Sequence, residues 1–241
     1  MLSEHVDSGV LRENVARVHD KIADAARNAG RRPDEIALVA VSKLKDADTV
    51  AAANQLDFFC FGENHVQEIV QKAAVHAYGD KPVHMIGHLQ TNKVAKIVGL
   101  CPLIQSVDSF RLAQEIAKRA LALGISQDIL IEVNIGGEAS KSGILPGELR
   151  AELEKIAPLA GLRVMGLMTV PPIAARAGEN KRYFAAMHQL FVDIEAEKYD
   201  NVNMECLSMG MSGDYCDAIA EGATMVRVGT AIFGARNYGG R

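Results

Sequence analysis

Eight short apolar runs alternate with amphipathic helical patterns along most of the 241-residue chain. Continuously apolar runs are typical of strands covered on both faces, and therefore of parallel pairing. Eight strand–helix units in this length predict an α/β protein with a closed (β/α)8 TIM barrel. One further helix is expected at about residues 10–29, before the first strand. The predicted strands are 36–43, 57–62, 83–89, 103–108, 128–134, 163–170, 204–212 and 224–234.

The main alternative is a doubly wound open sheet. Such a sheet usually has fewer strands, and the first turn after a strand here lacks the G-x-G-x-x-G fingerprint of dinucleotide-binding folds. No Pro/Gly/Ser-rich linker, low-complexity tract or repeat interrupts the chain, so residues 1–241 are predicted to form a single domain. In the helical pattern that follows 103–108, Asp108 or Ser109 is a candidate N-cap and Gly124 a candidate end.

Charge and hydropathy exclude several classes of partner. The formal net charge is -4 and the pI about 6.0, which gives no basic footprint for nucleic acid or an anionic membrane. No apolar run reaches the roughly 20 residues of a membrane-spanning helix, and the N-terminal stretch has no signal-peptide core. We therefore expect a cytoplasmic protein without nucleic-acid or membrane partners. Covered strands and even charge favour a monomer.

Cysteine and histidine spacing indicates no metal site. No C-x-x-C pair occurs, so reduced thiols are expected. His84 and His88 are four residues apart, but they lie in a strand pattern, where this spacing does not form a helix-face metal pair. The four cysteines are Cys60, Cys101, Cys206 and Cys216.

Lys43 ends the first apolar run, "IALVAVSK", residues 36–43. Barrel enzymes carry their chemistry at the carboxyl ends of the strands. Burial disfavours the charged form of an amine, so a lysine at a dry barrel mouth is expected to supply a neutral amine that attacks a carbonyl. The alternative is a structural strand-end lysine that snorkels to solvent beside Lys45.

Two glycine-rich turns follow the seventh and eighth runs. In "SMGMSGDY", residues 208–215, small residues including Ser212 precede a short predicted helix, whose N-terminal amides suit a phosphate. In "RVGTAIFG", residues 227–234, Gly229 allows a ligand to approach the backbone and Thr230 adds a hydroxyl. Barrels often bind phosphate with the loops after strands seven and eight. A phosphorylated aldehyde held there would reach Lys43, and pyridoxal 5′-phosphate (PLP) is the obvious candidate.

The sequence resembles the pyridoxal phosphate homeostasis protein family. This family is similar in fold to the N-terminal barrel of alanine racemase and of eukaryotic-type ornithine decarboxylase. The matching stretches extend over nearly the whole chain. They are "AVSK" (40–43), "FGENHVQE" (61–68), "HMIGHLQTNK" (84–93), "SVDS" (106–109), "VNIGGEASKSG" (133–143), "GLMTVPP" (166–172), "LSMGMSGDY" (207–215) and "MVRVGTAIFGAR" (225–236).

The resemblance implies roles for particular residues. Lys43 would form the Schiff base with PLP, and a phosphate group would be held by Ser212, Gly229 and Thr230. Arg227 matches the arginine that faces the pyridine nitrogen in this fold class. A donor that is always charged keeps that nitrogen unprotonated and weakens the ring as an electron sink. Without the resemblance, a structural ion pair would be the simpler interpretation of Arg227.

Other residues have weaker signals. Asn64, after the second run, either contacts the ring or caps the next helix. Lys141, in the loop after the fifth run, is either a solvated lysine or a second, weaker PLP contact. The final stretch, "RNYGGR", lacks a lysine pair associated with some family members, which weakens any role for C-terminal lysines in PLP handling.

Two functional classes fit these residues best. In the first, which the resemblance favours, the protein binds PLP and buffers or delivers it, with PLP-dependent apo-enzymes as recipients and an effect on amino-acid and keto-acid balance. In the second, it is a PLP-dependent amino-acid racemase, which needs another acid–base group on the opposite face of the substrate. Alanine racemase takes that group from an additional domain that this sequence lacks, so we expect no turnover. A phosphosugar-binding barrel without PLP remains only if Lys43 is structural.

Overall fold

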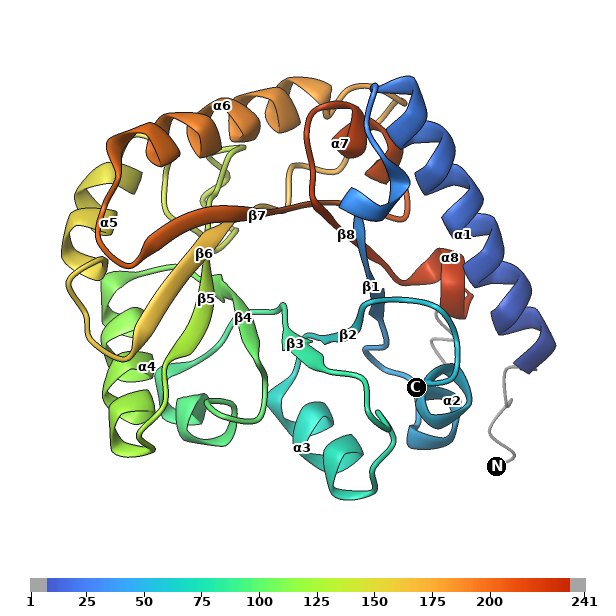
Figure 1. The fold of residues 1–241 in the computed structure, drawn as a ribbon, viewed down its shortest axis with the longest axis horizontal. Helices are drawn as coiled ribbons and strands as arrows, with labels where there is room; N and C mark the ends of the chain where they lie inside the picture. Colours follow the sequence, from blue (N-terminus) through green and yellow to red (C-terminus); the bar gives the residue numbers. More distant parts are fainter. Residues whose placement is uncertain (1–7, 235–241) are drawn as a thin grey trace.

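The protein is a closed barrel of eight parallel strands in sequence order, β1 to β8, as seen in a computed structural model that describes residues 8–234 (Figure 1). The ring closes where Ala37–Ala40 of β1 pair with Met225–Val228 of β8. The (β/α)8 prediction is therefore confirmed. The strands are β1 Ala37–Val41, β2 Cys60–Glu63, β3 Val83–Met85, β4 Leu103–Val107, β5 Gln127–Glu132, β6 Leu162–Met168, β7 Val202–Met211 and β8 Met225–Val228.

Helices surround this ring. The predicted extra helix is α1 (Ser8–Asn28), which buries residues spaced three or four apart, such as Leu11, Val15 and Val18. It runs along the outside of the barrel beside α7 and α8 (Figure 1). Within residues 8–234, no helix is both long and apolar enough to cross a membrane. The remaining helices are η1 Pro33–Glu35, α2 Ala47–Ala53, α3 Val66–Ala74, η2 Thr91–Lys96, α4 Phe110–Ala122, α5 Leu149–Ile156, α6 Lys181–Glu197, α7 Tyr215–Ala220 and α8 Thr230–Phe233.

Most of the observed strands are shorter than the predicted runs, and two of them differ most. The run 224–234 ends as a strand at Val228, and its last residues form α8, whose Ile232 and Phe233 are buried. The run 83–89 is paired only to Met85, and its Gly87 passes so close to Asn64 that a Cβ would lie 2.6 Å from the Asn64 carbonyl oxygen. An apolar run indicates buried residues, and residues stay buried beyond the point where the strand stops pairing. The runs therefore overestimate the lengths of most of the strands.

Helix ends follow the predicted capping. Ser109 is the N-cap of α4, where its Oγ accepts a hydrogen bond from the Leu112 amide at 3.3 Å. Gly124, directly after the C-cap of that helix, has a φ of +67°, a conformation that glycine adopts without steric cost.

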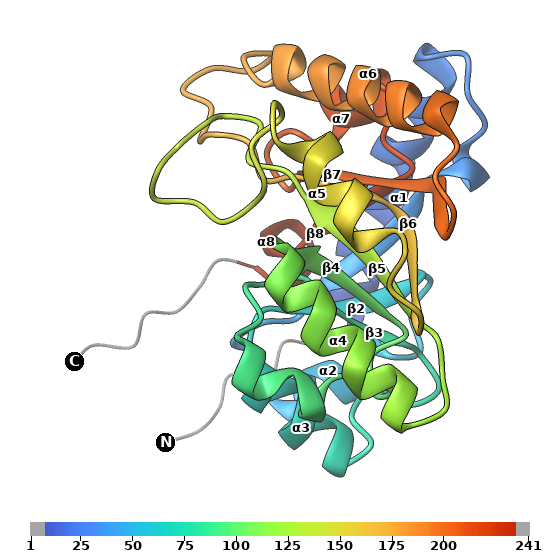
Figure 2. The ribbon, with the colours of Figure 1, turned by 90° about the vertical axis from the view of Figure 1, so that its left-hand side faces the viewer.

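The interior of the barrel has its own small core, which determines what points toward the mouth. It contains Val39 of β1 and Met225 of β8, with Val41 packed against it. Because side chains alternate along a strand, the next inward positions are Lys43 after β1 and Arg227 on β8. The loops after β5 and β6 project from the same end of the barrel in Figure 2. That end carries the candidate site.

Candidate PLP site at the carboxyl end of the barrel

A pocket of about 310 Å³ opens at the carboxyl ends of the strands. All the residues predicted as site residues line it, although they come from four separate parts of the chain. Val41, Ile86, Val170 and Met211 add apolar walls. The predicted residues are Lys43, Asn64, Ser212, Arg227, Gly229 and Thr230. The structure thus brings these residues together, and their contacts with a ligand remain a prediction.

The backbone around Lys43 is anchored on both sides. The Ser42 side chain is fully buried, and its hydroxyl donates to Glu63 Oε1 at 2.7 Å. Leu44 adopts a φ of +63°, unusual for a residue with a branched side chain, and its amide donates to Glu68 Oε2 at 2.7 Å. These bonds hold the turn that presents Lys43 at the edge of the pocket.

A buried lysine, Lys72 of α3, connects the two anchors. Its Nζ donates to the Ser42 carbonyl at 3.0 Å, to Glu63 Oε1 at 2.7 Å and to Glu68 Oε2 at 2.9 Å. Glu63 is completely buried, and this burial raises its pKa, although the charge and hydrogen bond of Lys72 act to lower it. The sequence prediction missed this cluster. The spacing of Glu68 and Lys72 signals a helical ion pair, but nothing local signals that it is buried.

Arg227 is buried at the inner wall of the pocket. Its NH1 donates to Ser208 Oγ at 2.7 Å, and its NH2 donates to the Thr169 carbonyl at 2.7 Å. Burial lowers its pKa to about 10, while the nearby carboxylates of Glu132 and Asp214 act to raise it. The guanidinium therefore remains charged at neutral pH. In the part of the chain that the structure describes, Arg227 donates to Ser208 and to the Thr169 carbonyl rather than to a carboxylate, so a simple structural ion pair does not account for it.

The turns after β7 and β8 are joined at Ser212. Its Oγ accepts hydrogen bonds from the amides of Gly229 at 3.2 Å and Ala231 at 3.5 Å. A Cβ at Gly229 would lie 3.2 Å from the Val41 carbonyl oxygen, so a larger residue would crowd β1. Glycine fits at position 229 because the chain after β8 passes close to the end of β1.

Asn64 does not cap α3, because His65 occupies the N-cap position. The Oδ1 atom of Asn64 is buried and makes no hydrogen bond within the described part of the chain, while the residue lines the pocket. A buried acceptor without a partner is costly, so a ligand that donates a hydrogen bond would stabilise this arrangement.

Glu132 also faces the barrel mouth, and the sequence prediction missed it. Leu130, two residues earlier on β5, lies in the inner core, so the alternation of the strand directs Glu132 inward. Burial and the charge of Asp108 raise the pKa of Glu132 to about 7, against opposing effects of Arg227 and His88. Its electrostatic interaction with Arg227 crosses the barrel interior, since β5 and β8 are not neighbouring strands.

Replacing Glu132 with glutamine is expected to increase stability more at pH 8 than at pH 4. The folded-state pKa, about 7, lies above the ordinary 4.5, so the wild type loses stability as pH rises between these values, whereas glutamine does not ionise. The gain from Glu132→Gln should therefore grow by about 3 kcal/mol between pH 4 and pH 8. Urea unfolding at both pH values measures it. Glu195→Gln, at an exposed site, is the control, and a pH-independent effect of Glu132→Gln would contradict the shift.

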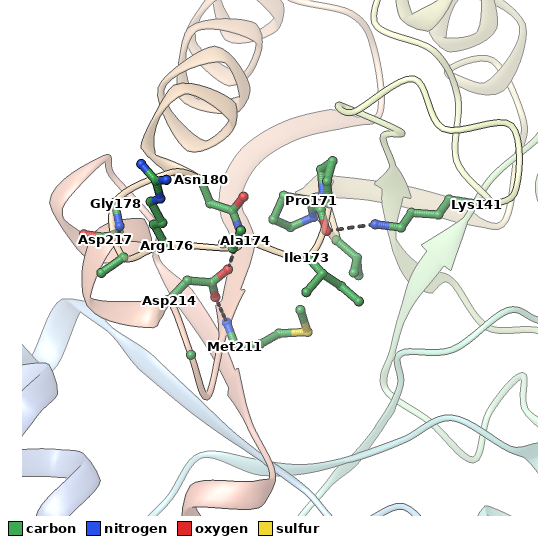
Figure 3. A pocket seen from close by; sticks show the side chains of 15 residues that line it. Lys141, Pro171, Ile173, Ala174, Arg176, Gly178, Asn180, Met211, Asp214 and Asp217 are labelled. Carbon is green, nitrogen blue, oxygen red and sulfur yellow. Dashed lines mark hydrogen bonds between the residues drawn. The ribbon is translucent and has the colours of Figure 1, made fainter.

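A second cavity, of about 560 Å³, adjoins the first and shares Val170, Met211 and Gly213 with it. Lys141 lines this second cavity (Figure 3), where its Nζ donates to the Pro171 carbonyl at 2.9 Å and pairs with Glu138 Oε2 at 2.6 Å. Asp214 lies on the opposite side and accepts from the Met211 amide. A second PLP contact at Lys141 therefore remains a prediction, separate from the pocket of Lys43.

The two histidines considered above have different surroundings. His84 is buried in the barrel interior, which lowers its pKa to about 4. His88 lies beyond β3, and its Nδ1 is 3.0 Å from Asp108 Oδ2. Among residues 8–234, no group of three or more His, Cys, Asp or Glu side chains is arranged to hold a metal ion. The C-terminal stretch "RNYGGR" lies outside the described residues.

The fold and the site define a barrel of the alanine racemase N-terminal type. The family model described as "Alanine racemase, N-terminal domain" matches residues 6–237. An alanine racemase from Clostridium difficile has a similar structure, with a TM-score of 0.69, 17% sequence identity and coverage of 94% of this chain and 57% of that chain. At this identity the likeness concerns the fold alone.

More similar relatives identify the family. A pyridoxal phosphate homeostasis protein from Pseudomonas aeruginosa is 42% identical over 232 residues, which cover 95% of this chain and 97% of the relative. PipY from Synechococcus elongatus, solved with PLP bound, is 35% identical, with a TM-score of 0.77 and coverage of 88% of this chain and 100% of that chain. The chain belongs to the pyridoxal phosphate homeostasis protein family, as the sequence resemblance indicated.

Proposed function

We propose that this protein binds PLP through Lys43 and serves in intracellular PLP homeostasis, by buffering the cofactor or delivering it to apo-enzymes. The observation that carries the proposal is a single pocket lined by Lys43, Arg227, Ser212 and Thr230 at the carboxyl end of the barrel. The name of the Pseudomonas relative and the PLP-bound PipY structure support it. We further propose that the protein acts as a monomer in the cytoplasm.

The residues of the pocket fit the chemical groups of PLP. The amine of Lys43 would attack the aldehyde carbon, form a C=N bond and release one water. The hydroxyls of Ser212 and Thr230 offer hydrogen-bond donors to a phosphate, since Ser212 Oγ accepts from the amides of Gly229 and Ala231 and keeps its own proton to donate. The unpaired oxygen of Asn64 suits a ring hydroxyl, and Arg227 offers only donors to the ring nitrogen.

The relatives, rather than Arg227, favour a carrier over a racemase, because the resemblance assigns the same arginine to the whole fold class, alanine racemase included. PLP supplies an electron sink when its ring nitrogen is protonated, and a guanidinium that can only donate opposes that protonation. Relatives are named homeostasis proteins, and the racemase similarity concerns the fold alone. We therefore propose that this protein has no amino-acid turnover of its own.

Trapping with borohydride tests the proposal. Purified protein is mixed with PLP, its absorbance is recorded, the C=N bond is reduced, and the labelled peptide is identified by mass spectrometry. We expect one label per chain, on Lys43. Full labelling of Lys45 or Lys141 instead would contradict the site, and no spectral change would favour a phosphosugar-binding barrel. Racemisation of amino acids, abolished by Lys43→Ala, would overturn the carrier function.

A further inference from the structure

A continuous line of polar side chains runs through the barrel interior, where most TIM barrels are filled with apolar residues. Arg227 NH1 lies 2.7 Å from Ser208 Oγ, which lies 2.7 Å from Gln105 Oε1. Gln105 Nε2 lies 3.0 Å from His84 Nδ1. None of these four side chains is more than 3% exposed. They come from β8, β7, β4 and β3, so the line crosses the barrel rather than following its wall.

The direction of every hydrogen bond in this line follows from Arg227. A guanidinium only donates, so Ser208 Oγ accepts from it and uses its own proton to donate to Gln105 Oε1. The remaining group of Gln105 is an amide NH2, which only donates, so His84 Nδ1 must accept. All three bonds therefore point from the mouth of the barrel toward its amino-terminal end.

The line determines the tautomer of His84. Burial lowers the pKa of this ring to about 4, so it is neutral at pH 7 and carries one proton. Since Nδ1 accepts from Gln105, that proton is on Nε2. Cys60 Sγ, 3.3 Å from the same Nδ1, is compatible with this arrangement as a second donor. His84 also lines a cavity of about 520 Å³ at the amino-terminal end, together with Phe59 and Leu103.

We propose that Ser208 and Gln105 are positioning residues for Arg227 and that the same line of hydrogen bonds holds His84 as its Nε2–H tautomer. Ser208 and the Thr169 carbonyl hold the two NH groups of Arg227 at fixed positions. Gln105 in turn orients the Ser208 hydroxyl, so that its lone pairs face the guanidinium. The effect of Ser208 and Gln105 on PLP binding rests on the proposed function, in which Arg227 faces the ring nitrogen. The tautomer of His84 does not depend on that function.

Nitrogen NMR of the ligand-free protein tests the direction of the line. In the wild type, the His84 proton should be on Nε2. Gln105→Glu preserves the side-chain volume but replaces the donor with an acceptor, so the proton should move to Nδ1 or both nitrogens should be protonated near neutral pH. A wild-type proton on Nδ1, or an unchanged tautomer in Gln105→Glu, would overturn the proposed direction.

Ligand binding tests the positioning of Arg227. Ser208→Ala should weaken PLP retention on the order of tenfold, the equivalent of one lost hydrogen bond, and shift the absorbance of the bound cofactor. Ser208→Thr, which keeps the hydroxyl, should largely restore both. Ser106→Ala is the matched control, because Ser106 is equally buried on β4 but donates to the Gly87 carbonyl instead.

The two proposals fail in distinguishable ways. If Ser208→Ala and Ser106→Ala had equal effects on PLP retention and on the absorbance of bound PLP, the positioning role of Ser208 would be wrong. Labelling of Lys43 in the wild type would still support the proposed function. If the wild type forms no bond to PLP at all, the proposed function fails, and the His84 tautomer still decides whether the line exists.

Discussion

Replacing Lys43 with alanine is expected to abolish covalent retention of PLP and leave the fold intact. The change removes the attacking amine, while the turn remains anchored by the Ser42–Glu63 and Leu44–Glu68 hydrogen bonds, which do not involve the Lys43 side chain. PLP that still entered the pocket would be held only by its phosphate and ring contacts. Gel filtration after incubation with PLP, followed by absorbance and circular dichroism, measures both parts of this prediction.

Lys45 provides the matched control for Lys43. It is a neighbouring lysine, but its Nζ donates to the Phe233 carbonyl at 2.9 Å and so ties the loop after β1 to α8. Lys45→Ala should therefore keep the covalent label and lose only part of the affinity. If Lys43→Ala retained a full covalent label, or if Lys45→Ala lost it, the assignment of the attacking amine would be wrong.

Replacing Lys72 with methionine is expected to destabilise the fold by about 3–5 kcal/mol near neutral pH, the usual cost of leaving a buried charge without its partner. The Lys72 side chain is 6% exposed and that of Glu63 is 0% exposed. Methionine fills a similar volume, so the effect isolates the charge. The free energy of unfolding is measured by urea titration.

The Lys72→Met effect should shrink as the pH falls. The folded-state pKa of Glu63 is already raised by burial, and removal of Lys72 removes the charge that opposes this rise. When the pKa of a carboxyl is higher in the folded state than in the unfolded state, the protein loses stability as the pH rises toward the folded-state pKa. The variant should therefore recover part of its stability in acid. Adding Glu63→Gln should recover stability at neutral pH as well.

Lys118→Met is the control for the loss of a lysine. Lys118 is 78% exposed and lies 4.0 Å from Glu115, and exposed pairs of this kind contribute about 1 kcal/mol or less. Equal destabilisation by Lys72→Met and Lys118→Met would show that the buried cluster is not important for stability.

The barrel could be predicted because each of its strands is encoded locally. A residue run such as 36–43 is apolar on both faces, and this property is visible without knowing its neighbours. Lys43 is likewise recognisable from the local sequence as a polar residue at a strand end, and so are the small residues around Ser212. The closed fold then brings these predicted residues to one pocket, because the carboxyl ends of parallel strands meet at the same end of a barrel.

Some of the missed residues have partners far away in the chain, and others, such as Lys72 and Glu68, are close in sequence but give no local sign of burial. Gln105 and Ser208 are separated by 103 positions, and Ser208 and Arg227 by 19. Glu132 resembles any polar residue that ends a strand until the ring closes and places it across the interior from Arg227. Hydrophobic periodicity is a local property and survives in the one-dimensional sequence. Burial of a particular charge, and the hydrogen bonds that compensate it, depend on which strands the closed barrel places opposite one another.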